Sequence, residues 1–114
     1  MSPESQQSRL HGDQKDQKIL FPEAAVSLTP NDLVVRAKTT SGGSAFTITL
    51  APVAEMIGKI VSILMVSKDG GKDITIADKA DDGGRADITF NLAADSALLY
   101  CDGFKYTIIA SNGI

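Results

Sequence analysis

His11 and Cys101 are the single histidine and the single cysteine of the chain, and both residue types can take part in chemistry near neutral pH. His11 lies in a polar N-terminal segment, and Cys101 alternates with Leu99 along an expected strand. A cysteine nucleophile needs a positioned base, and one cysteine alone forms neither an internal disulfide nor a zinc site. The sequence therefore predicts a non-enzymatic protein with no catalytic residue, no cofactor and a buried, unreactive thiol.

The segment Gly70-Gly71-Lys72-Asp73 has the composition of the end of a phosphate-binding loop. Such a loop also needs an upstream glycine at a fixed spacing and a helix that follows it, and the sequence offers neither. Glycine and aspartate are common in turns because they tolerate unusual backbone conformations. We interpret the segment as a hairpin turn between two strands.

Acidic side chains gather in expected loops in the second half of the chain, at Asp69, Asp73, Asp78, Asp81, Asp82 and Asp87. Loop carboxylates can bind calcium, but the spacing does not match a helix–loop–helix calcium site, and nearby cationic residues dilute the charge. Asp78 and Asp87 would lie close together if the intervening chain closed a hairpin. Solvated loops are the favoured interpretation, calcium binding is the alternative, and no metal ligand is assigned. No carboxylate pair has a scaffold that would separate two pKa values, so glycosidase chemistry has no support.

The composition excludes several classes of protein. The chain has 114 residues, of which 43% are hydrophobic, and its net charge is −3. One globular domain fits this length and apolar content, whereas full disorder and a basic nucleic-acid surface do not fit. No apolar run is long enough for a membrane helix, and the polar start of the chain carries no apolar signal core. We therefore expect neither nucleic acid nor a membrane among the partners.

Short β-rich runs recur from residue 24 onward, separated by residues that favour turns. Apolar and polar residues alternate in several of these runs, which is typical of strands with one buried face. The fold class expected is all-β, a β-sandwich, a jelly roll or a small barrel. The eight expected strands are 25–28, 33–39, 45–50, 59–66, 74–77, 87–92, 97–101 and 104–110.

Three local patterns refine this expectation. Both faces of 59–66 are apolar, which predicts a central strand covered on two sides. Pro52 and Gly58 bracket one short helical turn near 53–57. Asp102-Gly103 between two β-rich runs favours a tight type I′ hairpin. The core is expected to need the alternating apolar side chains Ile63, Phe90 and Leu99.

The N-terminal segment differs from the rest of the chain, and we divide the protein into an arm over 1–22 and a single β domain over 23–114. Residues 1–18 contain one large aliphatic residue after Met1, Leu10, so they cannot bury enough apolar area to offset their ordering entropy. The arm is either a flexible terminus or a segment that becomes ordered when it binds a partner. Ile19, Leu20 and Phe21 form an apolar plug that either packs on its own domain or binds a neighbour.

From Phe46 to the C-terminus the chain resembles small virion proteins of tailed bacteriophages. In those proteins a strand ending in Thr-Leu is followed by a Pro-containing turn, a Gly-Lys pair that opens a long apolar strand, and a glycine-rich turn. A strand with an Ile/Val-Thr-Ile/Val-Ala-Asp pattern and a closing Leu-Tyr-Ser-Asp-Gly-aromatic hairpin follow. The matching elements here are Thr49-Leu50, Pro52, Gly58-Lys59, Ile74–Asp78 and Leu99–Phe104. Two residues depart from the pattern, since Cys101 replaces the usual Ser and Tyr106 stands where Trp is common.

The resemblance implies a capsid decoration protein, also called a cement protein, since 114 residues leave little room for the shaft of a fibre. Such a protein binds the outer shell of the virion, bridges major capsid protein subunits, and is assembled in the cytoplasm of the bacterial host. It also implies a homotrimer, because local threefold positions of a shell offer three equal sites. The capsid-contact candidates are Leu10, Ile19, Leu20 and Phe21. The alternative is a head-fibre or tail-fibre module that binds a receptor or carbohydrate, and an enzyme is the weakest interpretation.

Overall fold

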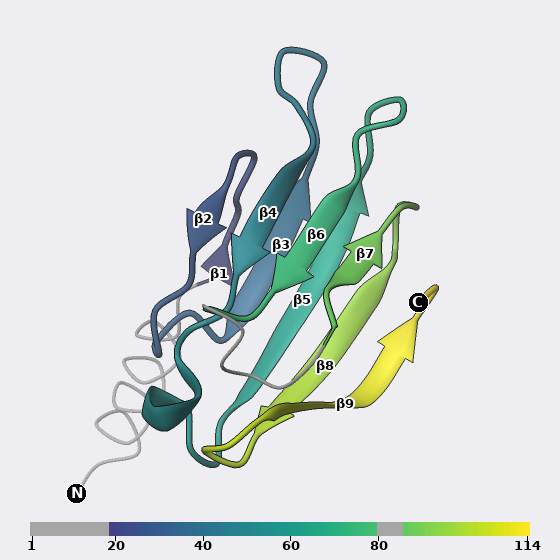
Figure 1. The fold of residues 1–114 in the computed structure, drawn as a ribbon. Helices are drawn as coiled ribbons and strands as arrows, with labels where there is room; N and C mark the ends of the chain where they lie inside the picture. The colour runs from purple at the N-terminus through teal and green to yellow at the C-terminus, as the bar shows by residue number, and fades with distance from the viewer. Residues whose placement is uncertain (1–18, 80–85) are drawn as a thin grey trace, which may run out of the picture.

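The computed structural model describes residues 19–79 and 86–114, which form a β-sandwich of two packed sheets (Figure 1). Sheet A has five strands in the order β1-β3-β5-β8-β9, and sheet B has four in the order β2-β4-β6-β7. The all-β prediction is confirmed, and the two open sheets make the fold a sandwich rather than a closed barrel. The strands are β1 (Ile19–Leu20), β2 (Val26–Ser27), β3 (Val34–Lys38), β4 (Phe46–Thr49), β5 (Ile60–Ser67), β6 (Ile74–Ala77), β7 (Ile88–Phe90), β8 (Ser96–Cys101) and β9 (Tyr106–Asn112).

The first six strands alternate between the two sheets, so this part of the chain winds around the core as a flattened coil (Figure 1). Neighbouring strands within each sheet are therefore parallel over this part. The partners of β3 and β5 in sheet A and those of β4 and β6 in sheet B are equally far apart in sequence: Val34 pairs with Ser62 and Phe46 with Ile74, each 28 positions along the chain. The preceding turn of the coil is shorter, since Val34 lies 15 positions after its partner Ile19 and Ile48 lies 22 positions after its partner Val26. The coil therefore has no fixed period, and no repeat is visible in the sequence.

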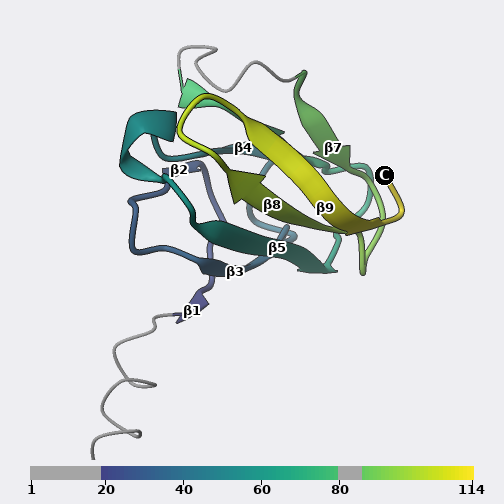
Figure 2. The ribbon, with the colours of Figure 1, turned by 90° about the horizontal axis from the view of Figure 1, so that it is seen from below.

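Antiparallel strands complete both sheets. β7 pairs with β6, while β8 and β9 extend sheet A beyond β5. β7 and β9 are the edge strands on the same side of the sandwich, and the C-terminus lies beside them (Figure 2). An open groove of about 320 Å³ between these two strands is lined by Asp87, Ile88, Thr89, Ile108, Ser111 and Ile114.

The core lies between the sheets and follows the alternation of each strand. Ile63, Phe90 and Leu99, which the sequence places in the core, are fully buried. Ile63 and Leu99 come from sheet A, and Phe90, Ile48 and Ile76, the last two also buried, face them from sheet B. This confirms the inward faces expected from the period-2 pattern.

The helical turn expected near 53–57 is present as the 3₁₀ helix η1 (Val53–Glu55). Pro52 precedes it, and Gly58 follows with φ +76, a left-handed conformation that glycine adopts without strain. The backbone N–H of Gly58 donates to the carbonyl oxygen of Cys101, so the turn leads directly into the pairing of β5 with β8.

The turn types predicted for two segments of the sequence are wrong. The connection at 102–103 is not a type I′ turn, because Cys101 pairs with Tyr106 across a four-residue loop. Asp102 Oδ1 accepts hydrogen bonds from the N–H groups of Phe104 and Lys105, and these bonds stabilise the longer loop. The glycine-rich segment 70–73 is not a hairpin turn either, because it leads from β5 in sheet A to β6 in sheet B.

The prediction that β5 is covered on two sides is also wrong within the described chain. Val61, Ile63 and Met65 face the core and are buried, whereas Ile60 and Val66 on the opposite face are exposed. Sheet B covers one face of sheet A, and no described segment covers the other. Packing among the described residues therefore does not account for the apolar outer face of β5.

Candidate interaction surface

The outer face of sheet A is the side that points away from sheet B, and its centre is apolar. Register places the side chains in rows, with Ile60 opposite Tyr100 and Ser62 opposite Leu98. Ile60 is 44% exposed and Tyr100 is 37% exposed. The apolar members of this outer face, from β3, β5 and β8, are Val34, Ile60, Leu64, Val66, Leu98 and Tyr100.

The outer face of sheet B has the opposite character. Thr47 on β4 pairs with Thr75 on β6, and Thr75 pairs with Thr89 on β7, so three threonines form a row across the sheet. Thr49 and Ser27 lie opposite each other on the same face. Threonine suits a strand that faces water on one side, because its branched side chain fits the pleat and its hydroxyl is solvated. The outer face of sheet A is thus apolar at its centre, whereas the outer face of sheet B carries the hydroxyl side chains expected of a face in contact with water.

Arg36 is a charged residue on the outer face of sheet A, next to Leu64 in the register. Its guanidinium is half-buried and donates through one nitrogen to the carbonyl oxygens of Val35, at 3.0 Å, and Ser62, at 3.3 Å. The charge is therefore held against the backbone of the sheet. Lys38, further along β3, forms an exposed ion pair with Glu23 at 3.6 Å.

The hairpin between β8 and β9 adds further apolar groups at the end of sheet A where Ile60 and Tyr100 lie. Phe104 at the tip of this hairpin is 84% exposed. Ile57 lies directly over Gly103, since a Cβ atom at Gly103 would come within 2.8 Å of Ile57 Cγ1. Gly103 is therefore required both for its φ of +95 and for this close approach.

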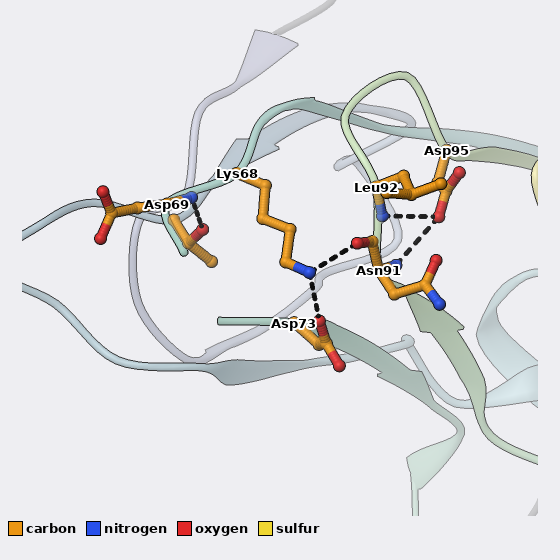
Figure 3. Close-up of polar contacts among 7 residues, drawn as sticks. Lys68, Asp69, Asp73, Asn91, Leu92 and Asp95 are labelled. Atoms are coloured by element: carbon orange, nitrogen blue, oxygen red, sulfur yellow. Dashed lines mark hydrogen bonds and ion pairs between the residues drawn. The ribbon is translucent and has the colours of Figure 1, made fainter. Parts of the chain in front are cut away.

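A polar cluster at the other end of the sandwich connects both sheets (Figure 3). Lys68 Nζ forms an ion pair with Asp73 Oδ1 at 3.0 Å and donates to the carbonyl oxygen of Asn91 at 2.6 Å. Asp95 is buried, and its Oδ2 accepts hydrogen bonds from the N–H groups of Asn91 and Leu92 at 2.9 and 3.0 Å. These contacts fix the turn between β7 and β8, and each group already has a structural partner.

The acidic residues considered for calcium do not converge within the described chain. Asp69 Oδ2 pairs with Lys72 Nζ at 2.9 Å, and Asp73 pairs with Lys68. Among residues 19–79 and 86–114, no three His, Cys, Asp or Glu side chains form a group that could hold a metal ion. Asp81 and Asp82 lie outside the described residues.

The sequence-predicted contact residues fall at the edge of sheet A or outside the described chain. Ile19 and Leu20 form β1, which pairs in parallel with β3, and Leu20 packs against the core. Ile19 and Phe21 are exposed, Phe21 at 67%. Leu10 lies outside the described residues, as does His11. The plug is thus divided, with Leu20 facing its own domain and its two neighbours facing outward.

Cys101 is buried in the core, and its Sγ lies 3.5 Å from the carbonyl oxygen of Val53. The predicted burial of this thiol is confirmed, and its lack of reactivity stays a prediction. Among the aromatic residues, Phe46, Phe90 and Tyr106 are buried.

Sequence reasoning missed the outer face of sheet A as a candidate binding surface. The signal was present, because 59–66 is apolar on both faces. Comparison of the chain with models of known protein families, and with curated proteins, gives no match. Among the described residues, no helix has both the length and the apolar character needed to cross a membrane.

Proposed function

We propose that this protein is a non-enzymatic structural protein that binds a protein surface through the outer face of sheet A. The observation that carries this proposal is the contrast between the two outer faces. The cross-strand neighbours Ile60 and Tyr100 on the outer face of sheet A are large and apolar. The cross-strand neighbours Thr47 and Thr75 on the outer face of sheet B carry hydroxyl groups. Exposure of Ile60 and Tyr100 to water does not stabilise a monomer, whereas burial of both side chains stabilises an interface.

The resemblance to small virion proteins supports a more specific proposal, in which the bound surface is the outer shell of a tailed phage. In this role the protein is a capsid decoration protein that bridges major capsid protein subunits and stabilises the head. The sandwich would supply a rigid body, and the N-terminal arm would add contacts on a neighbouring subunit. Several weak contacts made by one molecule act together through a high effective concentration.

The test is binding to purified capsids that lack this protein. In the variant Ile60→Lys/Tyr100→Glu, two exposed neighbours become an oppositely charged cross-strand pair, so the net charge and the pairing of β5 with β8 are kept. The matched control is Thr47→Lys/Thr75→Glu, which places the same pair on the outer face of sheet B. We expect the first variant to lose capsid occupancy and the control to keep it. Equal occupancy of both variants would contradict the proposal.

The fibre-module alternative is favoured by a different observation, the high exposure of Phe104 at the tip of the β8–β9 hairpin. Exposed aromatic side chains at loop tips can stack on sugar rings and fill receptor pockets. Under this alternative, Phe104→Ala abolishes binding of the protein to host cells while leaving binding to capsids unchanged. Under the decoration proposal, wild-type protein does not bind host cells.

A further inference from the structure

Three neighbouring strands of sheet A contain no charged residue on either face. The strand sequences are IVSILMVS for β5, SALLYC for β8 and YTIIASN for β9. Charged residues make up 22% of the whole chain, so their absence from these strands is not a consequence of composition. They resume immediately outside the strands, at Lys59, Lys68 and Lys105. The uncharged surface therefore extends across the sheet and includes its edge at β9.

The edge strand β9 is seven residues long and is exposed from Ile109 to Asn112. Edge strands present unpaired backbone N–H and C=O groups, and soluble proteins usually protect them with charged side chains, prolines or short length. β9 has none of these three features, and the one protective device that it carries is a bulge. One register shift at Leu98/Leu99 makes Ile109 an extra residue in β9, and this bulge bends the strand at Ile109.

We propose that β9 pairs antiparallel with β9 of a second copy of this chain, around a two-fold axis that passes through the sheet near Ile109. Each copy carries a net charge of −3, so the overall charges of two copies repel each other. An uncharged edge can meet its own copy without bringing like charges together. The strand is also self-complementary, because an antiparallel pair of identical strands needs no second sequence.

The lengths of the other edges favour this two-fold arrangement over a ring. A ring of strand-paired copies needs two different edges of similar length on every copy. The other described edge strands, β1, β2 and β7, have two, two and three residues. None of these strands offers a partner for a seven-residue strand, whereas β9 of a second copy does. This dimer differs from the homotrimer that the family resemblance implies.

The groove between β7 and β9 supplies the apolar contact that strand pairing alone lacks. Ile88, Ile108 and Ile114 line this groove, and Ile114 is 45% exposed. In the dimer, β9 of the second copy lies along the mouth of the groove and covers these side chains. A two-fold axis through the sheet also places both outer faces of sheet A on the same side. The dimer would thus present two docking faces together, although the pairing itself does not depend on the proposed capsid role.

The test is the molar mass of the full chain in solution, measured by light scattering over a series of protein concentrations. We expect the mass to approach twice that of the 12.0 kDa chain as the concentration rises. Ile109→Lys, at an exposed position of β9, should remain at the mass of one chain throughout the series. Ala110→Lys serves as a second variant, and circular dichroism checks that both are folded. Thr47→Lys on sheet B is the matched control and should dimerise like the wild type.

Amide hydrogen exchange adds a local measurement on the same samples. Exchange at β9 should slow as the concentration of wild-type protein rises, while exchange at β7 stays unchanged or slows less. A wild-type protein that stays monomeric, or that forms a trimer, would overturn the proposal. Retention of the dimer by both folded lysine variants would also overturn it. None of these outcomes depends on capsid binding, so failure here is distinct from failure of the proposed function.

Discussion

The hydroxyl of Tyr106 donates a hydrogen bond to the carbonyl oxygen of Ala51, and this bond connects the two sheets inside the core. Tyr106 begins β9 in sheet A, and Ala51 follows β4 in sheet B. Both residues are buried, so water cannot replace either partner of the bond. This tyrosine therefore holds the hairpin end of sheet A against the opposite layer.

Tyr106→Phe should lower the free energy of unfolding by about 1–3 kcal/mol, because it leaves the buried carbonyl oxygen of Ala51 without this donor. Urea unfolding followed by circular dichroism measures the loss. Tyr100→Phe is the control, since Tyr100 lies on the exposed outer face, and it should change stability by less than about 0.5 kcal/mol. Equal effects of the two substitutions would contradict the role assigned to the Tyr106 hydroxyl.

Phe90→Ala should destabilise the sandwich by about 3–5 kcal/mol, because it removes a fully buried ring from the core. Phe104→Ala provides a matched control for the same chemical change at an exposed position. That control should stay within about 0.5 kcal/mol of the wild type. A loss below about 1 kcal/mol for Phe90→Ala would mean that β7 does not face the core.

Gly113→Ala should destabilise the end of sheet A. Gly113 has φ +77, and a Cβ atom there would lie 1.9 Å from Asp95 Oδ1. The left-handed conformation alone costs a non-glycine residue about 1–2 kcal/mol, and the buried Asp95 must also move. Gly42→Ala is the control, because nothing lies within 4 Å of its Cβ position. Thermal unfolding should separate the two variants, and identical melting temperatures would show that Gly113 is not held against Asp95.

The β8–β9 hairpin should lose stability as the solution becomes strongly acidic. Hydrogen bonds from the N–H groups of Phe104 and Lys105 lower the pKa of Asp102 below its ordinary value of 3.8. The lowered pKa means that the charged carboxylate stabilises the folded hairpin above pH 3.8, and that this contribution is lost as the pH falls through the lowered pKa. An NMR titration of the Phe104 amide should give a midpoint below 3.8. Asp102→Asn should remove the transition, and its persistence would assign it to another group.

Removing residues 1–22 should destabilise the domain more than removing residues 1–18. The longer deletion removes β1, the packing of Leu20 on the core, and the bond from the N–H of Lys38 to the carbonyl oxygen of Pro22. Full burial of one leucine contributes about 1.5–3 kcal/mol, and Leu20 is partly buried, so we expect a difference of about 1–2 kcal/mol. Differential scanning calorimetry of the two truncated proteins measures this. Equal melting temperatures would place β1 outside the cooperative unit.

Capsid occupancy of the same two truncated proteins tests the contact residues predicted from the sequence. If the exposed side chains of Ile19 and Phe21 bind the shell, occupancy should fall between the first deletion and the second. The point variant Phe21→Ala separates this effect from folding, because Phe21 is exposed. Full occupancy of the 1–22 deletion would contradict an arm that contributes to capsid affinity.

Most strands could be predicted from the sequence because alternation is a local property. The runs at 45–50 and 74–77 differ from β4 and β6 by at most one residue at each end. β1 could not be predicted because Ile19, Leu20 and Phe21 are three consecutive apolar residues that show no alternation. The pairing of strands could not be predicted in the same way. Parallel partners lie 15, 22 or 28 positions apart, and only the packed sandwich determines which runs become neighbours.

The candidate binding surface shows a different limit of sequence reasoning. The apolar residues on both sides of β5 indicate that both faces exclude water, and that pattern is present in the sequence. The pattern does not indicate whether the second cover comes from the same chain or from another molecule. Only the structure, by accounting for each described segment, shows that Ile60 and Val66 have no cover within the described chain.

The coiled path of the first six strands has a consequence for how proteins of this shape can vary in size. Each turn of the coil adds one strand to each sheet, so one more turn before β1 would widen both sheets by one strand. Such an addition would leave β7, β8 and β9 untouched, because these strands are added at the opposite side. Strands can therefore be added at the β1 side of the sandwich, while the opposite side keeps the β9 edge and the groove between β7 and β9. Lineages could change the width of this sandwich in steps of one turn while keeping the geometry of its β9 edge.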